Sequence, residues 1–351
     1  MAIIKLKKEY FTIVAIAVCI YFMFRFPLAV KEGVTEGLGI CFYTIIPSLF
    51  PFMTLSAYMV KSNIFSSVHR IISIPAKYIF RQPVCTIPAI FMSMIGGFPV
   101  GIKMVNELYT QEQITKKQAQ RLCLFCMNAG PAFVITAVGV NMLNSTKAGV
   151  IIYVSLCISS LFLGIVSSFL AEKNEETSKS KIQVQMPLSS LSASVSDALQ
   201  AVLGICAWVI LFSSITSCIK ILNISEHLYF FLTSVLEVTR GCTLISGKFS
   251  LPILAGVIGF GGICVHCQVL AYIKNIGMKY SHFLVSRIVN GALASLISYL
   301  LLLIFPVETD VFSGNDKIST ISFSVSTPAF FVFIAMCIIM IFDIDRKKKI
   351  W

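Results

Sequence analysis

The chain has 351 residues, of which 57% are hydrophobic and only 13% are charged. Soluble domains carry about 25% charged residues, so this composition excludes an ordinary soluble protein and indicates a chain buried largely in a lipid bilayer. The net charge of +12 comes from basic residues that lie among the apolar segments or at their ends. We attribute this charge to contact with an anionic membrane surface and expect no nucleic-acid partner.

The first apolar segment, residues 11–30, follows a cluster of lysines as the core of a signal peptide would. The segment is about twenty residues long, contains Arg25 and lacks a cleavage pattern of small residues. We therefore expect a retained transmembrane helix within residues 1–35.

The rest of the sequence contains an internal repeat. Three short motifs or residue pairs occur twice, in the same order and at a nearly constant offset. This recurrence predicts two repeats, at residues 36–170 and 196–345. A polar loop at 171–195 separates them, and a basic tail at 346–351 ends the chain. The motifs and pairs are Leu38-Gly39-Ile40-Cys41 with Leu203-Gly204-Ile205-Cys206, Ile95-Gly96 with Ile258-Gly259, and Arg121 and Asn128 with Arg287 and Asn290.

Each half contains the same predicted elements in the same order. A long apolar helix comes first, and a more charged stretch follows. A glycine-rich break then divides an apolar segment into two pieces of about twelve residues, too short to cross the bilayer singly, which favours a re-entrant hairpin. A second interrupted helix and a plain span complete each half. In the first half these elements are 36–60, 61–83, 85–109, 117–140 and 148–170, and in the second half 196–222, 224–248, 249–276, 281–305 and 319–344.

Topology depends on whether residues 224–248 cross the membrane. If they do not, each half has three crossings and the second half is inverted relative to the first, a common transporter arrangement. The basic tail at 346–351 then lies opposite the N-terminus, whereas the positive-inside rule places both ends in the cytoplasm. If residues 224–248 cross, both ends are cytoplasmic and the inversion is lost. We favour inversion because equivalent elements should behave alike.

Hairpin tips and helix breaks present free backbone groups near the bilayer centre, which suits a small polar or anionic solute. The alternative is that the glycines only permit tight turns and close packing, and that the asparagine amides bond to freed backbone groups. The candidate substrate-binding residues are Gly96, Gly97, Pro99, Gly101, Asn128, Gly130, Gly259, Gly261, Gly262 and Asn290.

Charged residues near these breaks are the next candidates. Lys103 and Glu107 lie one turn apart on one helical face, where they either pair with each other or line a solute pathway. Arg121 and Arg287 precede the interrupted segments, and we expect both to reach the lipid headgroups.

Two cysteine pairs have spacings that place their thiols on one helical face, and thiolate with imidazole suits zinc or iron. Cysteine is also a common small apolar residue in membrane helices, so we expect neither a metal nor a cofactor. The sequence contains no P-loop and no His-Glu-x-x-His motif, and we do not expect an enzyme. The residues concerned are Cys123, Cys126, Cys264, His266 and Cys267.

The run from Gly96 to Gly139 resembles the sporulation integral membrane proteins of the YlbJ type. These carry the Gate domain shared with concentrative nucleoside transporters and ferrous iron transporters. The resemblance implies two opposed hairpins and two unwound helices around a central solute site, in a cell membrane of an endospore-forming Gram-positive bacterium. Nucleoside transporters bind their substrate with Gln and Glu side chains, whereas these neighbourhoods offer Gly, Phe, Pro and Asn128 here, which puts a nucleoside substrate in doubt.

We therefore expect an all-α polytopic membrane protein that moves a small polar or anionic solute by alternating access. The alternatives are a membrane scaffold for spore assembly that transports nothing, and a metal-ion carrier that uses the cysteine pairs. The expected partners are the lipid bilayer and the solute, and a homo-oligomer is compatible with this interpretation.

Overall fold

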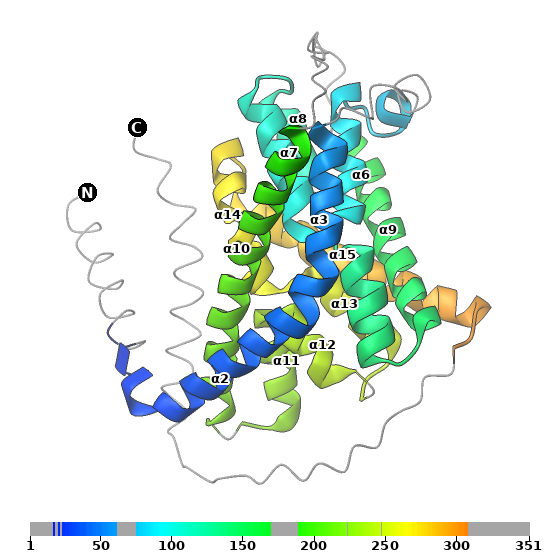
Figure 1. The fold of residues 1–351 in the computed structure, drawn as a ribbon. Helices are drawn as coiled ribbons and strands as arrows, with labels where there is room; N and C mark the ends of the chain where they lie inside the picture. Colours follow the sequence, from blue (N-terminus) through cyan, green and yellow to red (C-terminus); the bar gives the residue numbers. More distant parts are fainter. Residues whose placement is uncertain are drawn as a thin grey trace, which may run out of the picture.

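The computed structural model describes residues 23–61, 75–169, 189–222, 224–246 and 248–307, with residues 17, 20 and 21 before them. Every regular element in these ranges is a helix. Four of the helices are long and apolar enough to cross a membrane, and a bent pair makes a fifth candidate. The prediction of an all-α polytopic membrane protein is confirmed (Figure 1).

The first described candidate span is a bent path of α2 (Pro27–Ile40), the π-helical turn η1 (Cys41–Ile45) and α3 (Ile46–Lys61). Its two arms meet at 54°. Pro47 and Pro51 account for the bend, because a proline inside a helix removes a backbone donor and displaces the preceding turn.

This bent path packs along α10 (Ser189–Lys220), and we call α2, η1, α3 and α10 the scaffold pair. Glycine allows the two backbones to touch, because a Cβ on Gly33 would lie 2.6 Å from the carbonyl oxygen of Ser213. Where the two paths cross, Cys41 Sγ lies 3.7 Å from the carbonyl oxygen of Cys206. The final residues of the two Leu-Gly-Ile-Cys tetrads therefore meet.

The first hairpin consists of α6 (Ile87–Ile95) and α7 (Phe98–Thr110). Gly97 at its tip has a φ of 87°, a conformation that favours glycine. A Cβ on Gly101 would lie 2.9 Å from the Cα of Ser93. Residues eight apart in a straight helix are separated by about 12 Å, so the chain turns back here as predicted.

The second hairpin lies in a different segment from the predicted one. It consists of α11 (Glu226–Leu236) and α12 (Val238–Ile245), which meet at Glu237. A Cβ on Gly241 would lie 2.5 Å from the Cα of Ser234, so this pair also turns back.

The prediction of a hairpin at 249–276 is wrong. Helices α13 (Leu251–Phe260) and α14 (Gly262–Ile276) together form one candidate membrane span. Gly261 and Gly262 have φ values of 88° and 72°, which interrupt the helix without reversing its direction.

The predicted interruption of residues 281–305 is also wrong, because α15 (Tyr280–Ile304) continues through Asn290 and Gly291. Gly291 serves close packing instead, since a Cβ there would lie 2.7 Å from the carbonyl oxygen of Gly256 on α13.

The interruption predicted in the first half is confirmed. Helix α8 (Lys116–Cys123) and the π-helical η4 (Ala132–Met142) are separated by a non-helical segment that contains Asn128 and Gly130. The span α9 (Thr146–Ser168) follows.

Several predicted segments lie wholly or mostly outside the described residues. These are the N-terminal helix before residue 23, most of the stretch 61–83, the span 319–344 and the tail 346–351. In the predicted loop 171–195 the described residues, from 189 onward, belong to α10. Two short turns, η2 (Pro75–Ile79) and η3 (Val84–Thr86), precede the first hairpin.

Buried apolar side chains form two clusters. One lies mainly within the scaffold pair and includes Cys41, Ile45, Val202 and Val209. The other joins both hairpins, both interrupted helices, α9 and α15, which we call the hairpin body. Two cavities lie at the boundary between these clusters.

Candidate functional site

The tips of the two hairpins meet at a small cavity of about 40 Å³. Both interrupted helices and α10 complete its wall. The lining residues are Ile45, Leu49, Gly96, Gly97, Phe98, Pro99, Gly130, Phe133, Ile205, Val209, Glu237, Val238, Thr239, Cys264, Val265 and Gln268.

A larger cavity of about 440 Å³ adjoins it, between the scaffold pair and helices α7 and α14. The two cavities share Pro99, Ile205 and Gln268 as lining residues. Its other polar lining residues are Lys103, Glu107, Asp197 and Gln200, and its apolar wall includes Met53, Ala57 and Trp208. The larger cavity is therefore an amphipathic entrance to the hairpin junction.

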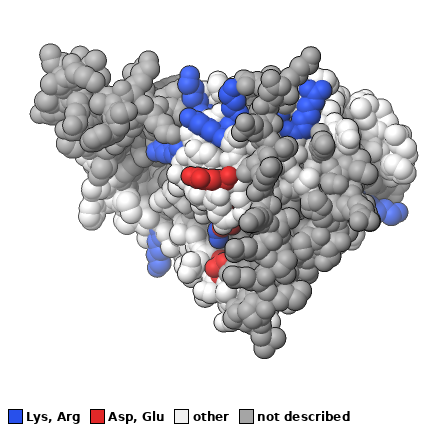
Figure 2. All heavy atoms as spheres, turned by 90° about the horizontal axis from the view of Figure 1, so that it is seen from above, with Lys and Arg blue, Asp and Glu red and all other residues white. Residues whose placement is uncertain are grey.

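This entrance lies toward the face where α3, α7 and α14 end and α8 begins, the upper face of Figure 1. Seen from above, Lys and Arg side chains gather on this face and few acidic ones appear (Figure 2). Exposed basic residues there include Arg81, Lys116, Lys117, Lys274 and Lys279.

Glycine lets each interrupted helix rest on the tip of the nearer hairpin. A Cβ on Gly130 would lie 2.8 Å from the carbonyl oxygen of Ile95, at the first tip. A Cβ on Gly262 would lie 3.1 Å from the backbone nitrogen of Val238, at the second tip. Gly130 therefore has a packing role as well as a place in the cavity wall.

Glu237 is the acidic residue of the small cavity, and its side chain is completely buried. Its carboxylate accepts hydrogen bonds from the backbone N–H groups of Thr239, at 2.9 Å, and Arg240, at 2.5 Å. Glu237 thus caps the N-terminus of α12 and closes the second tip. Sequence reasoning missed it as a site residue, although an acidic residue within an apolar segment is itself a functional signal.

The expectation that Arg287 on α15 reaches the lipid headgroups is wrong. It is 1% exposed, and its guanidinium donates to the carbonyl oxygens of Leu124 and Met127. These carbonyls belong to the non-helical segment after α8, which lacks helical partners for them. Arg121 is also buried, and it donates to the carbonyl oxygen of Arg81.

Both predicted asparagines make internal hydrogen bonds. The Asn128 amide donates to Ser160 Oγ at 2.8 Å and to the carbonyl oxygen of Phe125. Asn290 donates to the carbonyl oxygen of Gly259 at 3.0 Å and accepts from Ser159. Neither asparagine lines either cavity.

The structure thus brings together some of the predicted residues and separates others. Gly96, Gly97, Pro99 and Gly130 line the small cavity. Gly261 contacts its wall at Phe98, whereas Gly101 packs against Ser93 and Gly259 against α15. Lys103 and Glu107 line the larger cavity as an ion pair with a separation of 4.0 Å.

The cysteine pairs lie in different surroundings. Cys123 and Cys126 are buried within the hairpin body, and Cys264 lines the small cavity. The two ring nitrogens of His266 bond to the carbonyl oxygen of Phe260 and to the Tyr280 hydroxyl. Within the part of the chain that the structure describes, no three His, Cys, Asp or Glu side chains are grouped so as to hold a metal ion.

Comparison with known proteins finds a relative that spans most of the chain. The chain is 23% identical over 318 residues to the sporulation integral membrane protein YlbJ of Bacillus subtilis (strain 168), and the match covers 78% of each chain. No protein-family model and no solved structure matches the chain. The relative and the helices described above agree on a multi-pass membrane protein. The match confirms the resemblance to sporulation integral membrane proteins of the YlbJ type that the first hairpin and its following helix indicated.

Proposed function

We propose that this protein moves a small polar solute across a membrane by alternating access, in the context of endospore formation. The observation that carries the proposal is the junction of both hairpin tips with both helix breaks, at a small cavity that shares Pro99, Ile205 and Gln268 with a larger one. Free backbone groups at membrane depth occur where they are buried in protein or face a solute path.

The separate packing of the two bodies supports movement between them. The scaffold pair has its own apolar cluster, and both cavities lie where it meets the hairpin body. Sliding or rocking of the hairpin body along α3 and α10 would carry the junction from one membrane face toward the other. The buried contacts that such a movement would break include those of Cys264 in the scaffold cluster and of Ile219 in the other cluster.

The charge at the junction bears on the solute. Because Glu237 places a carboxylate at the small cavity, we expect a solute with hydrogen-bond donors or positive charge to be preferred over an anion. The sequence predicts a polar or anionic solute, and of these two classes the carboxylate favours the polar one.

Uptake into proteoliposomes tests the proposal, with radiolabelled nucleosides, amino acids, amines and inorganic anions as the panel. We expect uptake of at least one neutral or cationic member, reduced about tenfold or more by Gln268→Ala, which removes an amide shared by both cavities. Thr243→Ala, on the same hairpin as Glu237 but lining neither cavity, is the matched control. No uptake of any panel member would count against transport.

A membrane scaffold is the second candidate, and the size of the junction favours it. The cavity at the tips, about 40 Å³, is far smaller than the adjoining one of about 440 Å³. Under this alternative, Gln268→Ala leaves spore assembly intact, whereas variants that disturb the exposed surface of the protein impair it.

A further inference from the structure

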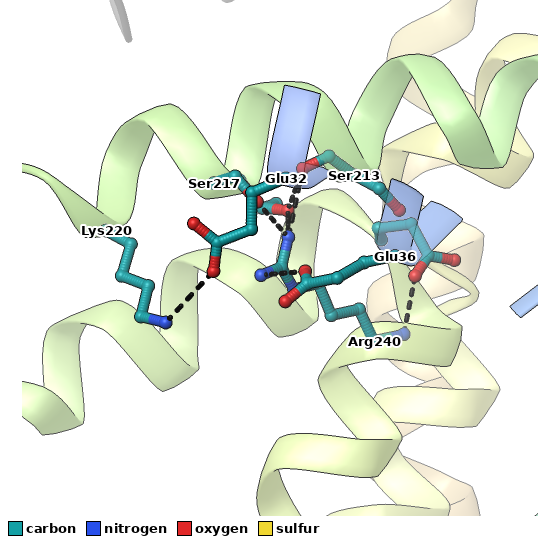
Figure 3. A network of polar contacts seen from close by, with 8 residues as sticks. Glu32, Glu36, Ser213, Ser217, Lys220 and Arg240 are labelled. Atoms are coloured by element: carbon teal, nitrogen blue, oxygen red, sulfur yellow. Dashed lines mark hydrogen bonds and ion pairs between the residues drawn. The ribbon is translucent and has the colours of Figure 1, made fainter. Parts of the chain in front are cut away.

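One polar network joins the second hairpin to the scaffold pair (Figure 3). At its centre is Arg240 of α12, which is 6% exposed. Its Nη1 donates to three acceptors on α10, namely the carbonyl oxygen of Ser213, Thr216 Oγ1 and Ser217 Oγ, at 2.7 to 2.9 Å. Its Nη2 lies 2.5 Å from Oε2 of Glu36 on α2. Arg240 therefore binds both helical paths of the scaffold pair.

The backbone of Arg240 is held equally firmly on the hairpin side. Its N–H group donates to the buried carboxylate of Glu237, which forms the hairpin tip. A displacement of this tip along α2 or α10 must therefore break the contacts of the Arg240 side chain, because its main chain cannot move independently of the tip.

The first hairpin has a very different residue at the matching position. Val100 and Arg240 each directly precede the glycine, Gly101 or Gly241, that packs against a serine of the other arm. Val100 lines the larger cavity and carries no charge. The two hairpins thus present a short apolar side chain and a long cationic one from the same place in their turns.

Glu36 and Ala201 of the scaffold pair stand at equivalent places relative to the two Leu-Gly-Ile-Cys tetrads. Glu36 lies five residues before Cys41, and Ala201 lies five residues before Cys206, the two cysteines that meet where the paths cross. Glu36 forms the ion pair with Arg240, whereas Ala201 lines the larger cavity beside Val100. One end of the boundary between the two bodies is therefore bridged by charge, and the other end is open.

We propose that the Glu36–Arg240 ion pair is a closed gate toward the lower face, and that the gap beside Val100 and Ala201 is the open entrance on the upper face. The proposal rests on the transport function proposed above. In the opposite state the pair separates and the second tip leaves α2. Glu36 already has 40% of its side chain exposed, so water can take the place of the guanidinium as the gate opens.

Hydrogen exchange of the full chain in lipid nanodiscs, read by mass spectrometry, tests the gate without a solute. Glu36→Gln removes the carboxylate that pairs with the guanidinium of Arg240, which is itself buried and is left without its counter-charge. We expect amides of residues 226–246 to exchange about tenfold faster, while exchange in 84–110 stays unchanged or slows.

Glu32→Gln is the matched control. Glu32 lies one turn earlier on α2 and pairs with Lys220 of α10 at 3.8 Å, but both side chains are about half exposed and neither belongs to a hairpin. Exposed pairs of this kind contribute little, so we expect less than about a twofold change in exchange at 226–246.

Arg240→Lys provides a second variant, since it keeps the charge and loses the fork of donors that reaches α10 and α2 together. It should accelerate exchange in the same segment. The gate is refuted if Glu36→Gln leaves residues 226–246 exchanging as in the wild type, or accelerates α9 and α13 equally. Absence of uptake in proteoliposomes alongside selective opening would instead count against transport and not against this contact.

Discussion

Single buried side chains stabilise the interrupted helices of this protein. Arg287 supplies donors to the carbonyl oxygens of Leu124 and Met127, and His266 bonds to that of Phe260 at the end of α13. Both residues come from neighbouring turns or helices of the hairpin body, where water is excluded. A helix end inside a membrane protein needs such partners because an unsatisfied carbonyl there is costly.

Replacing Arg287 should therefore destabilise the fold more than its distance from the cavities suggests. We expect Arg287→Met to lower the free energy of unfolding in detergent by about 3 kcal/mol, because two buried carbonyls lose their donors. Thermal or SDS titration of the purified protein measures the loss.

Lys279→Met, at the exposed start of α15, is the control, with an expected change within about 0.5 kcal/mol. Equal stability of the Arg287 variant and the wild type would show that the segment after α8 is satisfied by other means.

The roles of the asparagines and of Arg287 were beyond the sequence for a common reason. Their spacing correctly placed Asn128 beside a helix break, but Asn290 bonds to a carbonyl on α13 that is 31 positions away. Side chains that satisfy backbone groups on another element leave no local pattern, so the sequence alone cannot separate them from solute ligands.

Among the elements, the two hairpins differ in how their tips are made. The first turns at Gly96-Gly97, which the sequence predicted correctly, whereas the second turns at Glu237 without glycine or proline. A capping carboxylate replaces the usual breakers there, because it satisfies the first free N–H groups of α12.

Some glycines that predict a turn or a helix break serve close helix packing instead. The cluster Gly259–Gly262 and the pair Asn290-Gly291 were interpreted as a turn and a break, yet Gly259 and Gly291 bring α13 and α15 into backbone contact. Turning and close packing both require the absence of a Cβ, so residue type alone does not distinguish them.

The packing of α2 against α10 gives a direct test of the role of glycine in close helix contact. Gly33→Ala should destabilise the protein by about 1 to 3 kcal/mol, because the new Cβ would lie 2.6 Å from the backbone of α10 and would force the helices apart. Thermal unfolding in detergent measures the change.

Gly39 and Gly204 offer matched controls on the same two paths. A Cβ on either glycine would have no neighbouring atom within 4 Å, so alanine there should leave stability unchanged or raise it by up to about 1 kcal/mol. If Gly33→Ala behaved like these two, the close approach of α2 and α10 would be wrong.

For the whole molecule, the position of the second hairpin changes which segments of the second half are candidate crossings. The candidates there are α10, α13 with α14, and α15, which ends at Ile304. The sequence predicts a hairpin at 249–276 and a crossing at 319–344, and the latter lies outside the described residues.

The side of the membrane that the entrance faces can be measured by cysteine labelling. We expect Glu112→Cys and Lys279→Cys, on the upper face, to be protected from a membrane-impermeant maleimide in intact cells. Lys147→Cys and Lys248→Cys, on the lower face, should be labelled. The wild type, whose described cysteines are buried or half-buried, gives the background, and the reverse pattern would place the entrance on the outside.

The meeting of Cys41 with Cys206 has a consequence for how this chain tolerates change. Each cysteine ends a Leu-Gly-Ile-Cys tetrad, so in the repeat that the sequence predicts the contact joins a position with its own counterpart, as an isologous interface does in a symmetric dimer. A larger side chain at either position would meet the unchanged counterpart, and enlarging both would double the clash. Compensation at such a point must be made by a pair of unlike residues, and any divergence of the two halves is expected to begin there.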